Sequence, residues 1–224
     1  MIDIISATRL SPRDFWAKSA LGRSLTRLTK EPRIRPRIAF SNRKGLPEIY
    51  NSRIQAADAQ DVLLFVHDDV WLDEPHLLEQ LLAGLARYDV IGVAGNRRRA
   101  PFQPAWPFAD TRFVWDDPAN LSGAVAHGKL PEGQVSFYGD APADCEMLDG
   151  VFLAARKQVL LDKGVAFDTR FQFHLYDVDF CRTARQQGLR LGTWPIRITH
   201  QSDGPFATPT WSEQYRAYLE KWGD

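Results

Sequence analysis

The sequence has little of what secreted or membrane-spanning proteins need. Its 224 residues include two cysteines, Cys145 and Cys181, too few for a disulfide framework, so we expect free thiols. The longest apolar stretches, such as Val62–Val66, are about five residues, whereas a bilayer-crossing helix needs roughly 20. Asp3 stands where a signal peptide has basic residues. We therefore expect a mature cytoplasmic chain with no transmembrane helix.

The chain also lacks net charge, but its charges are unevenly spread. It has 28 basic and 28 acidic residues, yet residues 9–44 hold eleven Lys or Arg and only two acids. Such a segment can bind nucleic acid, anionic lipid or ligand phosphates, or it can be a solvated helix face without a partner. Nucleic acid ranks last among these readings, because the segment has no recognised motif and few stacking residues. We expect no nucleic-acid partner.

The first half of the chain alternates between strand-like and helix-like segments. Strands are expected at residues 2–7, 37–41, 62–66 and 90–94, and helices after Ser11, at 46–57 and at 75–87. Such alternation is typical of an α/β fold, a mostly parallel central sheet with helices on both faces. With 44% hydrophobic residues, the chain can fill one core of this kind, so we expect a single domain.

The second half begins with a break in this pattern. Residues 95–147 are rich in Pro and Trp and predict a long irregular insertion, with short strand candidates at 111–115 and 134–138. Regular structure then returns. We expect a strand at 148–155, a helix at 177–187 that ends at Gly188, an extended segment at 189–199 and a terminal amphipathic helix at 211–222.

The first candidate site follows the most apolar strand. His67, Asp68 and Asp69 come directly after Val62–Val66, at the carboxyl edge where open parallel sheets bind ligands. Neighbouring carboxylates repel each other unless a cation or donor groups offset their charge, so a divalent metal is plausible there. The alternative is that Asp69 or a nearby acid only caps the following helix.

Two more candidates lie further along the chain. Asp177 is at the start of a helix, where an acid is favoured by the helix dipole; in a partly dry pocket it can also act as a general base. His200 ends an extended segment and can join Asp69 as a metal ligand, or it is an ordinary surface histidine. The residues alone leave both alternatives open.

The order of these segments resembles that of the family 2 glycosyltransferases, which have the nucleotide-sugar-binding GT-A fold. Phe65-Val66-His67-Asp68-Asp69-Val70 is similar to the family's Asp-any-Asp motif, which holds a divalent ion against the donor diphosphate. Tyr176-Asp177-Val178-Asp179 is similar to its Glu-Asp motif, whose aspartate is the catalytic base of inverting enzymes. His200, followed by Gly204, matches the late histidine of the metal site. Residues 45–51 and 148–152 resemble segments beside the nucleotide and the acceptor.

The resemblance covers nearly the whole sequence and implies one GT-A domain over residues 1–224. Residues 1–95 would form the nucleotide-sugar-binding half, 96–147 the insertion and 148–224 the acceptor and catalytic half. The resemblance implies Asp177 as the base, and Asp69 and His200 as ligands of Mn²⁺ or Mg²⁺. The implied donor-binding residues are Thr8, Asn51, Asp68, Asp149 and Gly150.

The implied partners are a UDP-, GDP- or dTDP-sugar donor and a glycan or lipid-linked acceptor. The basic amino-terminal region would then rest on the inner face of the membrane, in a chain that makes surface polysaccharide. Aromatic residues of the insertion would either offer faces to an acceptor sugar or form a satellite core under the loop. They include Phe102, Trp106, Phe108, Phe113 and Trp115.

Four parts of the sequence depart from the family pattern. The first strand ends in Ala7-Thr8-Arg9 without the family's common Thr-Tyr-Asn. His67 replaces the first acid of the Asp-any-Asp motif, Tyr176 replaces the acid before Asp177, and Tyr50 replaces an Arg near the nucleotide. Two rival functions also stay open. One is a nucleotide-binding module without turnover, and the other is a metal-dependent hydrolase that activates water.

Overall fold

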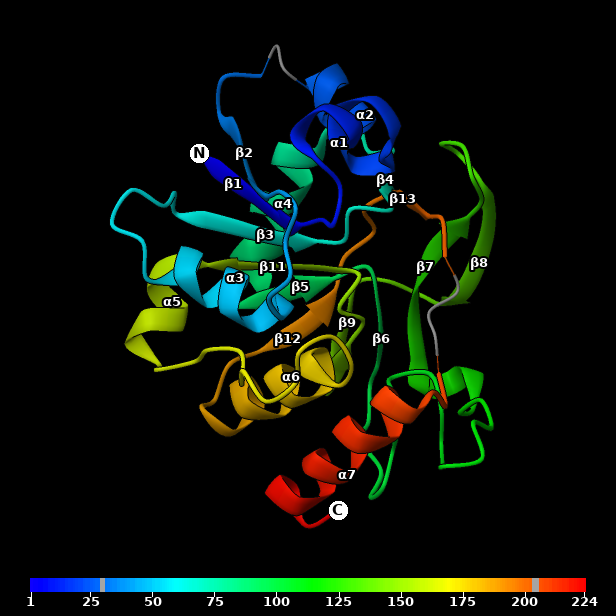
Figure 1. Ribbon diagram of the computed structural model, residues 1–224. Helices are drawn as coiled ribbons and strands as arrows, with labels where there is room; N and C mark the ends of the chain where they lie inside the picture. Colours follow the sequence, from blue (N-terminus) through cyan, green and yellow to red (C-terminus); the bar gives the residue numbers. More distant parts are fainter. Residues whose placement is uncertain (29–30, 203–205) are drawn as a thin grey trace.

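The structure is a computed structural model that describes residues 1–28, 31–202 and 206–224 (Figure 1). The helices in these residues are α1 (Pro12–Lys18), α2 (Ala20–Leu28), α3 (Leu46–Ile54), α4 (Leu77–Arg87), the short 3₁₀ helix η1 (Pro118–Asn120), α5 (Lys157–Asp162), α6 (Tyr176–Gln186) and α7 (Pro209–Trp222). The strands are β1 (Ile2–Ala7), β2 (Ile34–Ala39), β3 (Val62–Val66), β4 (Val70–Leu72), β5 (Val90–Gly92), β6 (Ala94–Asn96), β7 (Leu121–His127), β8 (Gln134–Gly139), β9 (Ala143–Cys145), β10 (Met147–Leu148), β11 (Phe152–Arg156), β12 (Leu191–Thr193) and β13 (Ile198–His200).

The larger sheet has seven strands in the order β2-β1-β3-β11-β5-β12-β9. Strands β2, β1, β3, β5 and β12 share one direction, whereas β11 and β9 run against them. All five residues of β3 are buried, as a continuous apolar run in a covered parallel sheet requires. Figure 1 shows α3 and α6 in front of this sheet and α4 behind it. The predicted α/β fold with a mostly parallel central sheet is confirmed.

A second sheet holds the residues that we expected to be irregular. It has the order β10-β6-β7-β13-β4. Strand β8 is not part of this order but also pairs with β7, in an antiparallel direction. The prediction that residues 96–147 are irregular is therefore wrong, because β7, β8 and β9 lie within them. The candidate strand at 134–138 is confirmed as β8. The candidate at 111–115 is wrong, since it contributes only an isolated bridge between Phe108 and Trp115.

Three segments that we expected as single strands each divide between two sheets or pairings. Residues 90–94 become β5 and the start of β6, 148–155 become β10 and β11, and 189–199 become β12 and β13. The first division occurs at Val93, whose carbonyl accepts a hydrogen bond from Ala124 N at 3.1 Å. Gly123 approaches so closely there, at φ +95°, that a Cβ atom would lie 2.0 Å from the Val93 oxygen. Apolar composition predicts a strand, but it does not show where the chain changes sheets.

The helices lie close to their expected positions. Ser11 caps α1 as expected, because its side chain accepts a hydrogen bond from Asp14 N at 3.2 Å. The first helix is interrupted at Ser19, whose hydroxyl donates to the carbonyl of Phe15 at 2.8 Å, and α2 follows. Strand β2 begins earlier than expected, since Ile34 pairs with Ile2.

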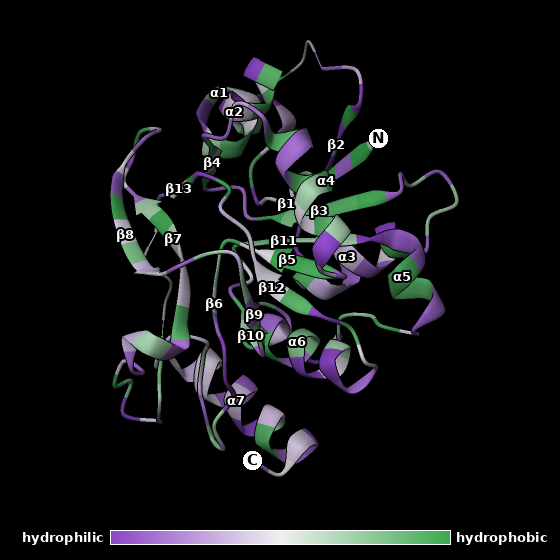
Figure 2. Ribbon diagram, turned by 180° about the vertical axis from the view of Figure 1, so that it is seen from behind, coloured by the Kyte–Doolittle hydropathy of each residue, from purple (hydrophilic) through white to green (hydrophobic). Residues whose placement is uncertain are grey.

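One hydrophobic core includes buried residues of both sheets, and the apolar segments in Figure 2 gather along the larger sheet. Both cysteines are buried and free, as expected. None of the described helices has the length and apolar character needed to cross a membrane. Because the parallel strands β1 and β3 end at the same edge, the polar residues that follow them meet there.

Candidate active site

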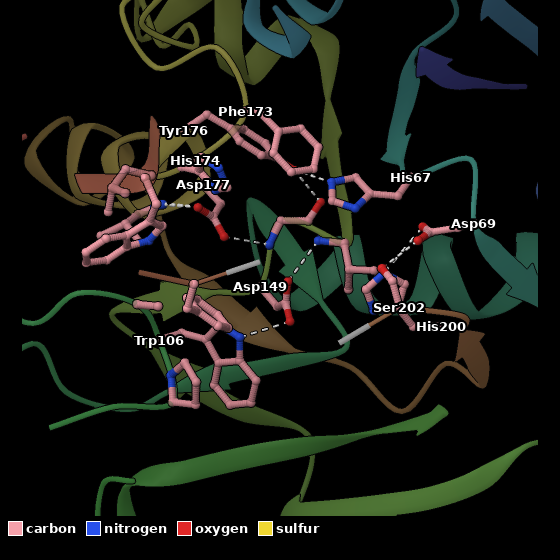
Figure 3. A pocket seen from close by; sticks show the side chains of 18 of the residues that line it. His67, Asp69, Trp106, Asp149, Phe173, His174, Tyr176, Asp177, His200 and Ser202 are labelled. Carbon is pink, nitrogen blue, oxygen red and sulfur yellow. Dashed lines mark hydrogen bonds and ion pairs between the residues drawn. The ribbon is translucent and has the colours of Figure 1, made fainter. Parts of the chain in front are cut away.

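A cavity of about 640 Å³ opens at this edge of the larger sheet (Figure 3). Its wall brings together most of the residues that the sequence singled out. They are Asp68, Asp69, Asp149, Gly150, Asp177 and His200. Thr8 and Asn51 do not line the cavity. Segments far apart in the sequence therefore meet in one place. If each acid only capped a helix, the acids would not need to lie together.

One end of the cavity holds a group of metal-type ligands. His67, Asp69 and His200 each offer one ligand atom, and these atoms all lie within 4.8 Å of one another. His200 Nε2 lies 3.3 Å from Asp69 Oδ1, and Ser202 Oγ donates to Asp69 Oδ2 at 2.7 Å. Two imidazoles and a carboxylate fit a divalent transition ion, and the nitrogen ligands favour Mn²⁺ over Mg²⁺. These residues therefore fit the expected metal.

The Asp69 carboxylate is ionised in this group. Burial by itself raises its pKa, but the hydrogen bond from His200 and the charges of His200 and His67 outweigh that effect. The net result is a pKa below the usual range of an aspartate. A negatively charged oxygen is thus available to a cation at neutral pH.

The hydrogen bonds of His67 determine which of its ring nitrogens can face a cation. Tyr176 donates its only hydroxyl hydrogen to the carbonyl of Gly150 at 2.8 Å. The 2.8 Å contact between Tyr176 and His67 Nε2 then requires that Nε2 carries the proton. Burial lowers the pKa of His67 and so favours the neutral form of the ring. In that form Nδ1 has the lone pair that a metal ligand needs.

Asp177 lies on the other side of the cavity, in the first turn of α6. Its Oδ2 accepts a hydrogen bond from Gly150 N at 3.0 Å, and its Oδ1 accepts one from Val178 N at 2.9 Å. Burial, and secondarily the nearby charge of Asp149, raises the pKa of Asp177 to about 6. A carboxylate with this pKa is a stronger proton acceptor than an ordinary aspartate and is still mostly ionised at pH 7.

The turn between β10 and β11 connects the two ends of the site. Asp149 Oδ2 accepts a hydrogen bond from Trp106 Nε1 at 2.9 Å, and its Oδ1 accepts one from Val151 N at 2.9 Å. Gly150 cannot be replaced without displacement, because a Cβ atom there would lie 2.4 Å from the Tyr176 hydroxyl. Figure 3 shows this turn between Asp177 and the group formed by Asp69 and His200.

The remaining expected residues support the site from outside. Burial raises the pKa of Asp68, and a hydrogen bond from the buried Thr8 opposes this rise. Asn51 uses its amide on the backbone of Phe167, with distances of 2.7 and 2.9 Å. Tyr50, which replaces the family's Arg, is fully buried against Phe65 and Phe167. The structure thus places Thr8 next to a cavity residue and Asn51 in a structural contact.

Sequence reasoning gave incomplete roles to three residues of the cavity. It placed His67 in the first candidate group but not among the metal ligands that the resemblance implies, gave no role to Ser202, and did not connect Trp106 with Asp149. A signal was present for His67, since it precedes Asp69 by two residues and both point the same way when the chain is extended. No sequence signal identifies the partner of Trp106, which is 43 residues away.

The fold is GT-A-like, as a similar solved structure shows. The crystal structure titled GalNAc-T7 with UDP, GalNAc and Mn²⁺ matches all of this chain, with a TM-score of 0.56 and 12% sequence identity. The match covers 48% of that protein, so the chain spans about half its length. The Drosophila β1,4-galactosyltransferase 7 catalytic domain with xylobiose matches 96% of this chain and 79% of its own, at a TM-score of 0.48 and 11% identity. S. aureus TarS 1–349 matches 89% of this chain and 60% of its own, at 0.47 and 13%.

The sequence profile of the glycosyltransferase-like family matches residues 36–219. The chain therefore belongs to that family. No curated protein sequence matches it significantly.

Proposed function

We propose that this chain transfers a sugar from a nucleoside diphosphate to an acceptor hydroxyl, with inversion at the anomeric carbon and with a divalent cation. One observation carries the proposal. The cavity separates a group suited to a cation, formed by His67, Asp69 and His200, from one carboxylate, Asp177, whose pKa is about 6. Sugar transfer to a hydroxyl needs both functions at the two ends of the reacting bond.

At one end of the cavity, a bound cation would stabilise the negative charge of the leaving group. Mn²⁺ or Mg²⁺, when bound, supplies Lewis-acid stabilisation of the negative charge that develops on the diphosphate. Asp69 contributes an ionised oxygen, His200 lies beside it, and Ser202 holds the carboxylate in place. Asp68 lines the cavity at the same strand end and would contact the donor's ribose or sugar.

At the other end of the cavity, a general base would accept the proton of the acceptor hydroxyl. Asp177 would accept the proton of the hydroxyl as its oxygen attacks the anomeric carbon from the face opposite the diphosphate. Its carboxylate is fixed by the backbone of Gly150 and Val178, which leaves little freedom to lose on reaction. One base acting once gives inversion, and such a base contributes about 10²- to 10⁴-fold to the rate.

The test is turnover with a panel of UDP-, GDP- and dTDP-sugars and Mn²⁺, with and without mixed glycan acceptors. We expect nucleotide release that requires both an acceptor and Mn²⁺, and a product of inverted anomeric configuration by NMR. Asp177→Asn should lower turnover by about 10²- to 10⁴-fold and leave nucleotide binding unchanged.

The rival functions give different results in the same assay. Sugar release to water at the same rate with or without an acceptor would identify a hydrolase. Nucleotide binding with no turnover of any donor would identify a binding module. A retained anomeric configuration would contradict the role of Asp177 as the only base.

We further propose that the acceptor is a glycan or is linked to a lipid, and that the reaction takes place at the cytoplasmic face of the membrane. The basic residues near the amino terminus support this location, because several exposed ones have no acidic partner among the described residues. They are Arg9, Arg13, Arg35 and Arg43.

A further inference from the structure

Exposed aromatic residues line the cavity, namely Trp115, Phe173 and Phe206, and Trp115 is the most exposed of them. Trp106 and Phe108 are only 6% and 8% exposed and belong to the interior, whereas Trp115 is 54% exposed and lines the cavity. Trp106 and Phe108 thus fit the role of a core under the loop, whereas Trp115 fits the role of a face for an acceptor sugar. An open indole surface inside a cavity is the type of surface that a ligand covers.

The indole of Trp115 is fixed in place before any ligand arrives. Its residue pairs with Phe108 in an isolated bridge, and Asp116 N, next along the chain, donates to the carbonyl of Pro107 at 2.8 Å. Asp116 is itself buried and bound to Arg98. A ligand therefore meets a backbone that need not be ordered on binding.

The ring is held as firmly as the backbone. It stacks on Tyr138 with centroids 5.9 Å apart and planes 20° apart, and it meets Trp106 edge-on at 6.4 Å. Tyr138 in turn contacts His127 Nε2 through its hydroxyl at 3.2 Å.

Polar side chains lie beside this ring. The residues of β8 alternate, so that Gln134, Ser136 and Tyr138 face the cavity whereas Val135 and Phe137 face away from it. Neither Gln134 nor Ser136 has a side-chain hydrogen bond to any other described residue, so both can bind a ligand's hydroxyl groups. The wall thus combines one flat apolar face with free polar groups next to it.

We propose that Trp115, with Gln134 and Ser136, binds a pyranose ring of the acceptor, which makes the acceptor a carbohydrate. A pyranose has a face of C–H groups that packs on an indole and a rim of hydroxyls that need hydrogen bonds. Trp106 connects this wall to the base, because it contacts Trp115 and donates to Asp149, next to the glycine that holds Asp177. This inference rests on the proposed function, since it takes Asp177 as the acceptor's base.

The test is saturation-transfer NMR with UDP, Mg²⁺ and a panel of defined probes. The probes are the methyl glycosides of glucose, galactose, mannose and N-acetylglucosamine, and a short peptide of serine and threonine. The variants are Trp115→Ala and Trp115→Phe. The matched control is Phe137→Ala, which removes an aromatic ring that is 69% exposed on the other face of β8.

We expect saturation of the ring C–H protons of at least one glycoside in the wild type. Trp115→Ala should reduce it about fivefold, Trp115→Phe should restore part of it, and Phe137→Ala should leave it unchanged. Saturation of the peptide alone, of no probe, or of a glycoside equally well with Trp115→Ala would overturn the inference.

The UDP signals in the same spectra separate this inference from the proposed function. UDP saturation without glycoside saturation would overturn only the carbohydrate site. Glycoside saturation that depends on Trp115, without any nucleotide binding, would contradict the proposed transfer and leave the carbohydrate site in place.

Discussion

Asp177 gives the site its expected dependence on pH. Because burial and the charge of Asp149 raise its pKa to about 6, the base form is present above that pH and is lost below it. We therefore expect kcat/KM for transfer to be level above about pH 7 and to fall toward tenfold per unit below the pKa. The measurement is a pH–rate profile with saturating Mn²⁺. A profile that stays level down to pH 5 would contradict the assignment of the base.

A second prediction concerns two departures from the family pattern that contact each other. His67 and Tyr176 lie 109 residues apart, yet His67 Nε2 and the Tyr176 hydroxyl are 2.8 Å apart. Tyr176→Phe removes the group that fixes the ring of His67, and outer partners of metal ligands typically change affinity by about 10- to 100-fold. We expect a loss of that size in Mn²⁺ affinity, measured by the EPR signal of free Mn²⁺.

The control for this experiment is Tyr88→Phe, which removes a buried tyrosine hydroxyl at the end of α4, outside the cavity wall. It should leave Mn²⁺ affinity as it is in the wild type. Equal Mn²⁺ affinity in Tyr176→Phe and the wild type would show that His67 does not depend on this hydrogen bond.

Among the elements, α7 is attached to α6 by buried charge. Lys221 Nζ lies 2.7 Å from Asp179 Oδ1 and 2.9 Å from Asp168 Oδ2, and Trp222 Nε1 also donates to Asp179. Asp179 is fully buried, so removing its cation leaves an unpaired carboxylate in the interior. Lys221→Ala should lower the free energy of unfolding by about 3–5 kcal/mol, measured by urea denaturation.

Two further variants serve as controls for the Lys221→Ala result. Lys163→Ala removes an exposed lysine at the end of α5 and should change stability by no more than about 0.5 kcal/mol. Asp179→Asn combined with Lys221→Ala should recover part of the loss, because no buried charge is left unpaired. Equal stability of Lys221→Ala and Lys163→Ala would show that this contact does not hold α7.

The elements also show what a sequence can predict. Strand β3 and the polar residues after it were found because a short apolar run and its abrupt end are both local. The split of residues 90–94 between two sheets was not found, since it depends on Gly123 approaching Val93 from another part of the chain. The contact between His67 and Tyr176 was not found for the same reason, because it joins residues that are 109 positions apart. Residue types were predictable, and long-range pairings were not.

At the scale of the whole molecule, part of the basic segment is neutralised within the fold. Arg33 pairs with Glu31 and Glu79, and Arg37 pairs with the fully buried Asp3. The exposed arginines without an acidic partner among the described residues lie near β2 and α1, which Figure 1 shows at one end of the molecule. The proposed membrane contact would therefore depend on fewer charges than the sequence alone indicates.

We expect the triple variant Arg9→Gln, Arg13→Gln and Arg35→Gln to lose binding to phosphatidylglycerol vesicles in a sedimentation assay. Each such charge contributes about 1 kcal/mol near an anionic surface, and salt screens it. Arg112→Gln, Arg216→Gln and Lys163→Gln change the net charge equally at other exposed positions. Equal vesicle binding by the two triple variants would contradict a specific membrane-facing end.

The proposed function requires that the cavity binds a nucleoside diphosphate through a cation held by Asp69. The most direct measurement is the thermal unfolding of the wild type, Asp69→Ala and Asp61→Asn with UDP, GDP, CDP or dTDP, each with and without Mn²⁺. Asp61 is an exposed acid just before β3, at the end of that strand away from the cavity, and serves as the control.

We predict that one nucleotide raises the unfolding temperature only when Mn²⁺ is present. A ligand at about 100 times its Kd adds about 2.7 kcal/mol to stability, enough for a clear shift. The shift should vanish in Asp69→Ala and persist in Asp61→Asn. No shift with any nucleotide, or an equal shift in Asp69→Ala, would contradict the account.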